Sequence, residues 1–207
     1  MLDPKIKILS KYIPEEAAPL IAQWINFYRC DFKISKSRNT KLGDYRPPHQ
    51  NEGHKISVNH NLNKYAFLVT TVHEFAHLVT WKEYKRNAKP HGLEWKENFK
   101  RMMIPFFELE IFPMDVKKAI ITYLQNPAAS SCTDLHLYKT LKSYDVQYLS
   151  FTLVEKIPNN HLFMMKNGRT FRKLEKIRKR YRCIEIETGH IYLFSPIAEV
   201  QLITSEG

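Results

Sequence analysis

Apolar positions recur with helical spacing in the first part of the chain and alternate with polar positions in the second part. Helical spacing predicts helices over residues 13–28, 61–84, 93–105 and 115–125. The helix over residues 61–84 has apolar flanks around a polar centre, as expected of a helix buried in a core. Asn61 or Asn63 could cap its first turn.

Shorter stretches between these helices alternate apolar and polar side chains, which predicts β-strands. Residues 30–46 indicate two strands, with Gly43-Asp44 as a turn signal, and residues 54–59 form a third. This third strand directly precedes the long helix. If it forms an edge of the sheet, its free backbone groups could pair with an extended peptide. The alternative is an ordinary structural strand.

Residues 126–131 combine a proline with small and polar residues, and we predict a domain boundary there. Beyond this segment, β-strands predominate. Asn167-Gly168 is a strong signal for a hairpin turn. The predicted strands are residues 148–154, 162–165, 182–187, 190–194 and 198–203.

Composition limits the classes of protein to consider. The 207 residues are 43% hydrophobic, which suits one domain of ordinary size with a smaller second one. The net charge of 32 − 21 = +11 favours an anionic partner, nucleic acid first and an acidic membrane surface second, although a merely soluble basic protein is the alternative. Three widely spaced cysteines argue against a disulfide framework. With no signal-peptide pattern and no apolar run of ~18–20 residues, we expect a cytoplasmic protein that does not enter a membrane.

The long helix carries the sequence His73-Glu74-Phe75-Ala76-His77. Positions four residues apart lie on one face of a helix, so both imidazoles can point at the same spot. Neutral imidazole is a good zinc ligand, and a carboxylate beside the metal can take a proton from a bound water. Ionisable groups buried in such a helix need a partner, which a metal would supply. The alternative is a histidine pair that is exposed or hydrogen-bonded without a metal.

A third zinc ligand is expected from the segment that follows this helix. His91 stands just before the next predicted helix, and the loop after His77 is long enough to return the chain to the metal. We therefore predict one zinc ion per chain, with His91 as the third ligand. Zinc sites with two histidines and one glutamate also exist, and Glu94 is the strongest rival because it lies just after His91. The rivals for this role are Glu83, Glu94 and Glu97.

The segment 166–182 is strongly basic, with nine lysine or arginine residues against one glutamate. Such a segment could contact nucleic-acid phosphates, and the interleaved Phe171 and Tyr181 could stack on bases. The alternative is a solvated basic hairpin. The candidate nucleic-acid-binding residues are Lys166, Arg169, Arg172, Lys173, Lys176, Arg178, Lys179, Arg180 and Arg182.

Several stretches together resemble the SprT-like family of zinc metalloproteases. They are residues 37–46, 56–59, 73–77 and 91–95. The resemblance implies a zincin-like domain in which His73, His77 and His91 bind zinc and Glu74 is the general base. It also implies an activity on proteins crosslinked to DNA that depends on the DNA.

The C-terminal part departs from this resemblance. Many family members carry a zinc ribbon with paired cysteines there, whereas this chain has Cys183 alone and no cysteine in the facing segment 157–163. Because structural zinc needs four ligands, we predict a ribbon-like hairpin domain without metal. The expected fold is α+β, with a SprT-like metalloprotease domain over residues 1–126 and a basic, β-rich, degenerate zinc-ribbon-like domain over residues 127–207.

The sequence therefore predicts a zinc-dependent endopeptidase with a protein or peptide substrate, acting on DNA-associated or DNA-crosslinked proteins. Two alternatives stay open. The chain could be a nucleic-acid-binding regulatory protein with a structural zinc and no protease activity, or a narrow peptidase that docks one partner protein on its basic hairpin. DNA-stimulated cleavage would separate the first hypothesis from both alternatives. The sequence does not predict an oligomeric state.

Overall fold

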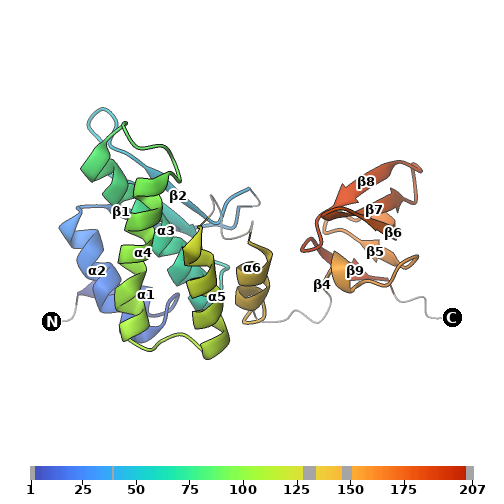
Figure 1. Cartoon of the computed structure of the whole chain (residues 1–207), viewed down its shortest axis with the longest axis horizontal. Coiled ribbons are helices and arrows are strands. Elements are labelled where there is room, and N and C mark those ends of the chain that lie inside the picture. Colours follow the sequence, from blue (N-terminus) through green and yellow to red (C-terminus); the bar gives the residue numbers. More distant parts are fainter. Residues whose placement is uncertain (1–2, 39, 128–133, 146–150, 204–207) are drawn as a thin grey trace. The chain divides into compact units, whose positions relative to one another are not determined.

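The computed structural model describes residues 3–38, 40–127, 134–145 and 151–203. The chain forms two compact units, residues 1–145 and 146–207, each with a hydrophobic core of its own (Figure 1). The mixed α+β class is confirmed. The predicted boundary at residue 126 adjoins a segment outside the described residues, and helix α6 (Leu135–Lys142), which lies beyond that boundary, belongs to the first unit.

Helix α3 (Lys64–Tyr84) is the central element of the first unit, and it confirms the long helix predicted from the sequence. Asn63 caps it, because its side-chain oxygen accepts a hydrogen bond from the Ala66 N–H at 3.0 Å. Most of its side chains are buried, including both apolar flanks and the polar centre. The helix ends at Lys85, whose φ of 55° turns the chain out of helical geometry.

A three-stranded sheet covers one side of α3. It consists of β1 (Asp31–Ser35), β3 (Lys55–Asn59) and β2 (Gly43–Arg46), in that spatial order. Strand β3 runs parallel to β1 and antiparallel to β2. The strand predicted over residues 54–59 is therefore the middle strand, and the expectation that it forms an edge is wrong. Its core-facing side chains, Ile56 and Val58, are almost fully buried.

The free edge near the histidines belongs instead to β2, which packs on α3. The turn predicted at Gly43-Asp44 is also wrong, because both residues lie inside β2 with ordinary strand geometry. A glycine in a strand can mark a close approach of another element rather than a turn. Here that element is α3, whose Thr70 and Glu74 side chains lie against Gly43.

The other helices of the first unit complete its core. The predicted first helix is shorter than expected, since residues 15–17 form a 3-10 turn and Pro19 then occupies the first turn of the α-helix, where a missing N–H costs nothing. An additional short helix at the N-terminus was not predicted. The unpredicted helix is α1 (Pro4–Leu9). The others are α2 (Ala18–Phe27), α4 (Leu93–Glu108) and α5 (Met114–Gln125).

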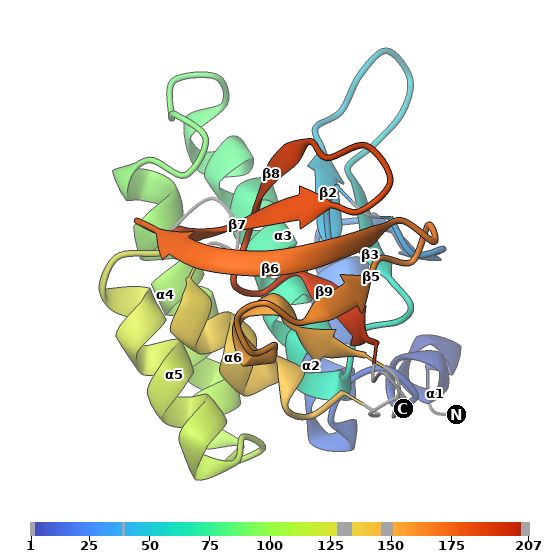
Figure 2. The same ribbon diagram turned by 90° about the vertical axis from the view of Figure 1, so that its right-hand side faces the viewer.

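The second unit is a six-stranded antiparallel sheet in the order β4-β9-β5-β6-β7-β8 (Figure 1). Figure 2 shows its strands β6 and β7 side by side. Gly168, with a φ of 84°, turns the chain between β5 and β6, which confirms the predicted hairpin. The buried Cys183 is part of the core. The β-rich character is thus confirmed, while the closer likeness to a zinc ribbon stays a prediction. The strands are β4 (Thr152–Leu153), β5 (Leu162–Met164), β6 (Thr170–Ile177), β7 (Arg180–Glu185), β8 (Ile191–Phe194) and β9 (Glu199–Leu202).

The strand predicted over residues 148–154 is only partly accessible to comparison, because residues 146–150 lie outside the described residues. Strand β4 begins at Thr152, and Val154 already starts a 3-10 turn. Among the helices of the described ranges, none combines the length and the apolar character needed to cross a membrane.

Candidate metal centre

Three histidines converge on one point at the surface of α3. The Nε2 atoms of His73 and His77 lie 3.2 Å apart, and the Nε2 atom of His91 lies 2.9 Å from His77 and 3.3 Å from His73. The first two come from successive turns of α3, and the third comes from the loop before α4. The three residues that the sequence singled out are therefore brought together.

This cluster fits a metal ion better than it fits a hydrogen-bonded network. A neutral imidazole has one N–H, so three ring nitrogens that face one another cannot all be satisfied by hydrogen bonds among themselves. Two nitrogens bound to one zinc in tetrahedral geometry at ~2.0–2.1 Å would lie about 3.3 Å apart, close to the observed spacing. No other group of three or more histidine, cysteine or acidic side chains in the described residues is arranged to hold a metal.

Trp95 fixes the orientation of the three imidazoles. Its side chain is fully buried, and its ring lies 4.7 Å from His73, 5.2 Å from His77 and 4.6 Å from His91 between ring centroids. Four rings packed in this way leave each histidine little freedom to rotate. The ligand set is thus held in place before any metal arrives, which lowers the entropic cost of binding one.

The rival glutamates are not part of this cluster. Glu83 accepts hydrogen bonds from Asn98 and from Arg101, at 2.9 Å and 2.6 Å, on the neighbouring helix. Glu94 lies in the first turn of α4, and neither it nor the exposed Glu97 joins the group of potential metal ligands. His91 is therefore the residue that completes the triad.

Glu74 lies beside the triad, between α3 and β2, and only 7% of its surface is exposed. A Cβ atom added to Gly43 would fall 2.4 Å from the Glu74 Oε1 atom, so the missing side chain of Gly43 makes room for this carboxylate. Burial, and then the charge of Asp44, raises the pKa of Glu74 to about 8 despite the opposing effects of Arg38 and Lys41. The carboxylate is thus held in a narrow seat at the edge strand.

Tyr45 and His54 form a second contact between β2 and the triad. The Tyr45 ring stacks on His77 with a centroid separation of 6.3 Å and an interplanar angle of 2°. Its hydroxyl group lies 2.9 Å from the Nδ1 atom of His54, and His54 in turn packs edge-on against Trp81. Because its hydroxyl already has this partner, Tyr45 supports His77 through its ring.

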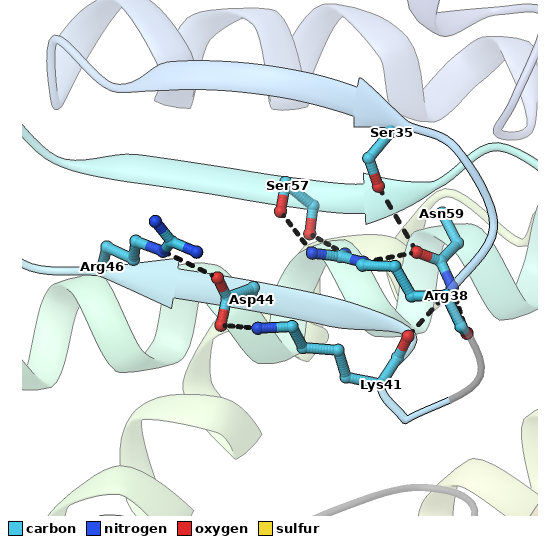
Figure 3. Close-up of polar contacts among 7 residues, drawn as sticks. All are labelled: Ser35, Arg38, Lys41, Asp44, Arg46, Ser57 and Asn59. Atoms are coloured by element: carbon cyan, nitrogen blue, oxygen red, sulfur yellow. Dashed lines mark hydrogen bonds and ion pairs between the residues drawn. The ribbon is translucent and has the colours of Figure 1, made fainter.

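Asn59 hydrogen-bonds the connection between β1 and β2 to the sheet (Figure 3). Its side chain is almost completely buried. The Asn59 amide donates to the backbone carbonyls of Arg38 at 3.2 Å and Lys41 at 2.9 Å, and its oxygen accepts from Arg38 Nε at 2.9 Å. Arg38 also donates to Ser57 Oγ at 3.0 Å. These bonds hold the chain that leads directly into Gly43, and so they fix where β2 meets α3.

A cleft with a volume of about 400 Å³ opens beside the triad. Edge strand β2 forms one wall, and the end of α3 with the following loop forms the other. Glu74 and the three histidines lie along it, so a molecule that enters the cleft meets both the metal-binding nitrogens and the carboxylate. The site therefore combines a metal-binding triad, a buried carboxylate and access from solvent.

Opposing protonation equilibria are expected to give the metal-free protein a stability optimum near pH 6.5. Burial lowers the pKa of His73 and His91, and it lowers that of His77 to about 3, so below pH 6.5 the unfolded state binds more protons than the folded state. Stability therefore falls as the pH decreases from 6.5. Glu74, whose pKa is raised to about 8, acts in the opposite direction, because the folded state keeps its proton while the unfolded carboxyl is ionised.

We expect chemical denaturation with a chelator present to show both slopes. From about pH 6.5 to 8, Glu74 alone should cost about 2 kcal/mol of unfolding free energy. The Glu74→Gln variant should lose this decline and keep the decline at lower pH. If the wild type and the variant have the same profile above pH 6.5, then Glu74 is not a buried, protonated group in the metal-free protein.

The nine candidate nucleic-acid-binding cations do not form one uniform surface. Lys173 is buried and donates to two backbone carbonyls of its own unit. Three more pair with acidic side chains, namely Lys166 with Glu199, Arg169 with Glu185, and Arg182 with Glu175. The remaining five are exposed, have no acidic partner among the described residues and lie on β6 or at the tip of the β6–β7 hairpin. They are Arg172, Lys176, Arg178, Lys179 and Arg180.

Sequence reasoning missed the residues that position the histidines and Glu74. Gly43 and Tyr45 lie in the second of the two strands predicted over residues 30–46, but Gly43 was mistaken for a turn residue, and His54 was one lone histidine among nine. Trp95 was recognised only as a core residue of the next helix and as part of the stretch that follows His91. No spacing rule connects Gly43 and Tyr45 to the triad, because they reach it through the order of the strands.

An α+β domain with a histidine triad that can hold a metal, next to a buried carboxylate and an open cleft, is the arrangement of a metallopeptidase-type domain. Residues 15–115 match the model of the SprT-like family, and this confirms the resemblance seen in the sequence. This part of the chain is thus similar to the SprT-like family, whose members generally have a metalloprotease-like domain. No curated protein and no solved structure gave a match.

Proposed function

We propose that the protein is a zinc-dependent endopeptidase that acts on proteins associated with DNA. The observation that carries this proposal is the convergence of three imidazole nitrogens within 3.3 Å of one another, beside a buried glutamate, in a cleft that is open to solvent. A purely structural zinc site is closed by four protein ligands, whereas a catalytic one keeps a position open. Three ligands and an adjoining cleft therefore favour catalysis over the regulatory alternative.

The residues divide the chemistry among themselves. His73, His77 and His91 would hold a zinc ion, which supplies a Lewis acid and lowers the pKa of a bound water to about 7. Glu74 would take the proton from that water and pass it to the nitrogen of the departing amine. A cation on the histidines favours the ionised form of Glu74, which is the form that can accept a proton.

Strand β2 is suited to hold the substrate. It pairs with β3 on one side only, and Gly43, Asp44 and Tyr45 line the cleft on its other side. An extended peptide can add to such an edge through backbone hydrogen bonds, which depend little on the side chains of the peptide. This binding mode would let one site accept many proteins, as a protease for diverse DNA-bound proteins requires.

The association with DNA rests on the exposed cations of the β6–β7 hairpin. The test is cleavage of a DNA-binding protein by the zinc-loaded chain, with and without single-stranded DNA. We expect DNA to stimulate cleavage. A variant with glutamine at the exposed hairpin cations should lose this stimulation, and the slope of log affinity against log salt should decrease by ~0.7 for each phosphate that is no longer neutralised. The positions to replace are Lys176, Arg178, Lys179 and Arg180.

A control variant replaces Lys166 and Arg182, which already pair with acidic side chains within the unit. This variant should retain most of the stimulation by DNA. Cleavage that is equally fast without DNA would remove the DNA part of the proposal and would favour a peptidase for one dedicated partner. Zinc binding without cleavage of any protein would support the regulatory alternative.

A further inference from the structure

We propose that the end of the cleft formed by Trp81, Lys85 and Lys89 is a subsite for an acidic side chain of the substrate. This inference rests on the proposed peptidase function and adds a preference to it. The backbone of β2 can hold a peptide irrespective of its sequence, so any selectivity has to come from side chains that line the cleft elsewhere. These three residues form such a place.

The three residues reach the cleft for simple geometric reasons. Trp81 follows His77 by one helical turn on the same face of α3, and Lys85 caps the end of this helix, where its N–H donates to the Trp81 carbonyl at 2.8 Å. The ammonium group of Lys85 lies 4.1 Å from the centroid of the Trp81 ring. The loop then leads back through Lys89 to His91, so both lysines border the same cleft as the metal ligands.

Both lysines are available to a ligand. Their side chains are exposed, and within the described parts of the chain no acidic side chain pairs with either of them. The acidic side chain on the opposite wall, Asp44, is already paired with Lys41 at 2.8 Å and with Arg46 at 3.0 Å (Figure 3). This end of the cleft therefore carries two uncompensated positive charges.

The shape of this end favours a side chain over a bare anion. The indole of Trp81 borders the cleft with the Lys85 ammonium group over its ring, so the methylene groups of a glutamate would pass beside this indole while the lysines meet its carboxylate. Exposed ion pairs are weak, so the two lysines together should favour glutamate over glutamine by up to about tenfold in kcat/KM. Since both lysines are exposed to solvent, salt should weaken this preference.

Matched peptides test the subsite. Each peptide carries glutamate, glutamine or lysine at one of the positions around the scissile bond. At one position, glutamate should be preferred over glutamine by up to about tenfold at low salt. The double variant Lys85→Gln/Lys89→Gln should abolish this preference, and the charge reversal Lys85→Glu/Lys89→Glu should turn it towards lysine.

Lys82 provides the matched control. It lies on the same stretch of α3, but its ammonium group packs over the ring of Tyr28 at 5.2 Å and does not border the cleft. The Lys82→Gln variant, with an equal change in charge per residue, should keep the glutamate preference. A preference that survives in the double variant, or that disappears equally in the Lys82 variant, would overturn the subsite.

A binding measurement separates failure of the subsite from failure of the proposed function. Fluorescence anisotropy of the labelled glutamate and glutamine peptides on the Glu74→Gln variant requires no turnover. Tighter binding of the glutamate peptide, abolished by replacement of Lys85 and Lys89, would support the subsite even if nothing is cleaved. Equal binding of both peptides would overturn it. Loss of oligothymidylate binding in the double variant, with peptide binding unchanged, would assign the lysines to nucleic acid and overturn it too.

Discussion

Replacement of Glu74 by glutamine is expected to reduce cleavage by about a thousandfold or more while zinc stays bound. Glutamine has almost the same shape as glutamate, so it fits the seat opposite Gly43. It cannot accept a proton, and general acid–base catalysis by one positioned group contributes roughly 10²–10⁴-fold. The loss should appear in kcat at saturating substrate, because the proposed role of Glu74 is proton transfer.

Zinc content and folding serve as the controls for this variant. The imidazoles of His73, His77 and His91 would hold the metal without help from Glu74, so the variant should bind one zinc ion per chain, as elemental analysis can show. Its thermal unfolding should show a folded protein of at least wild-type stability at pH 8, since a neutral amide replaces a carboxyl that is buried at a cost. Substantial residual cleavage would contradict the proposed role of Glu74 and would direct attention to another base.

Replacement of Gly43 by alanine is expected to reduce cleavage by about a hundredfold or more. The new Cβ atom would lie 2.4 Å from Glu74 Oε1 and 2.8 Å from both Glu74 Cγ and Thr70 Cγ2, distances at which atoms cannot remain. Either the carboxylate rotates out of its seat or β2 moves away from α3. A shift of about 1 Å at a reacting group can cost 10²-fold in rate, and overpacking should cost about 1–3 kcal/mol in stability.

Two further variants identify the cause of this loss. Gly53→Ala is the matched control, because its Cβ atom would meet only the Arg29 carbonyl at 3.8 Å, and this variant should cleave normally. Combining Gly43→Ala with Thr70→Ala removes one of the two clashes, so it should recover stability but not cleavage. Zinc content should be normal in all of them. A Gly43→Ala protein with wild-type kcat would show that the position of Glu74 is not critical.

The chemistry-bearing residues of the candidate site could be predicted from the sequence because they follow short-range rules. His73 and His77 lie on one face of a helix wherever that helix goes, and Asn63 caps that helix through a contact with its own first turn. His91 was within reach because only the last turns of α3 and a short loop separate it from His77. Such relations depend on helical periodicity and chain length, which one sequence displays directly.

The parts that could not be predicted depend on how distant segments are ordered in space. Strand β3 lies between β1 and β2, so the edge strand at the site precedes the middle strand in the sequence. Because of that order, Gly43 is not a turn residue but the strand residue against which the Glu74 side chain packs. The same holds for the question of which hairpin cations remain unpaired. Glu175, Glu185 and Glu199 meet their basic partners only once the second sheet has formed.

The succession of the two units along the chain also bears on how the protein is made. Every residue of the triad, the carboxylate and its edge strand lies in the first unit, and the basic hairpin lies in the second. Domains generally fold as units during synthesis, starting from the N-terminus. The metal site can therefore assemble on the ribosome before the hairpin has been translated. If the chain has the proposed function, the first unit would take up zinc before the proposed DNA-binding hairpin has been made.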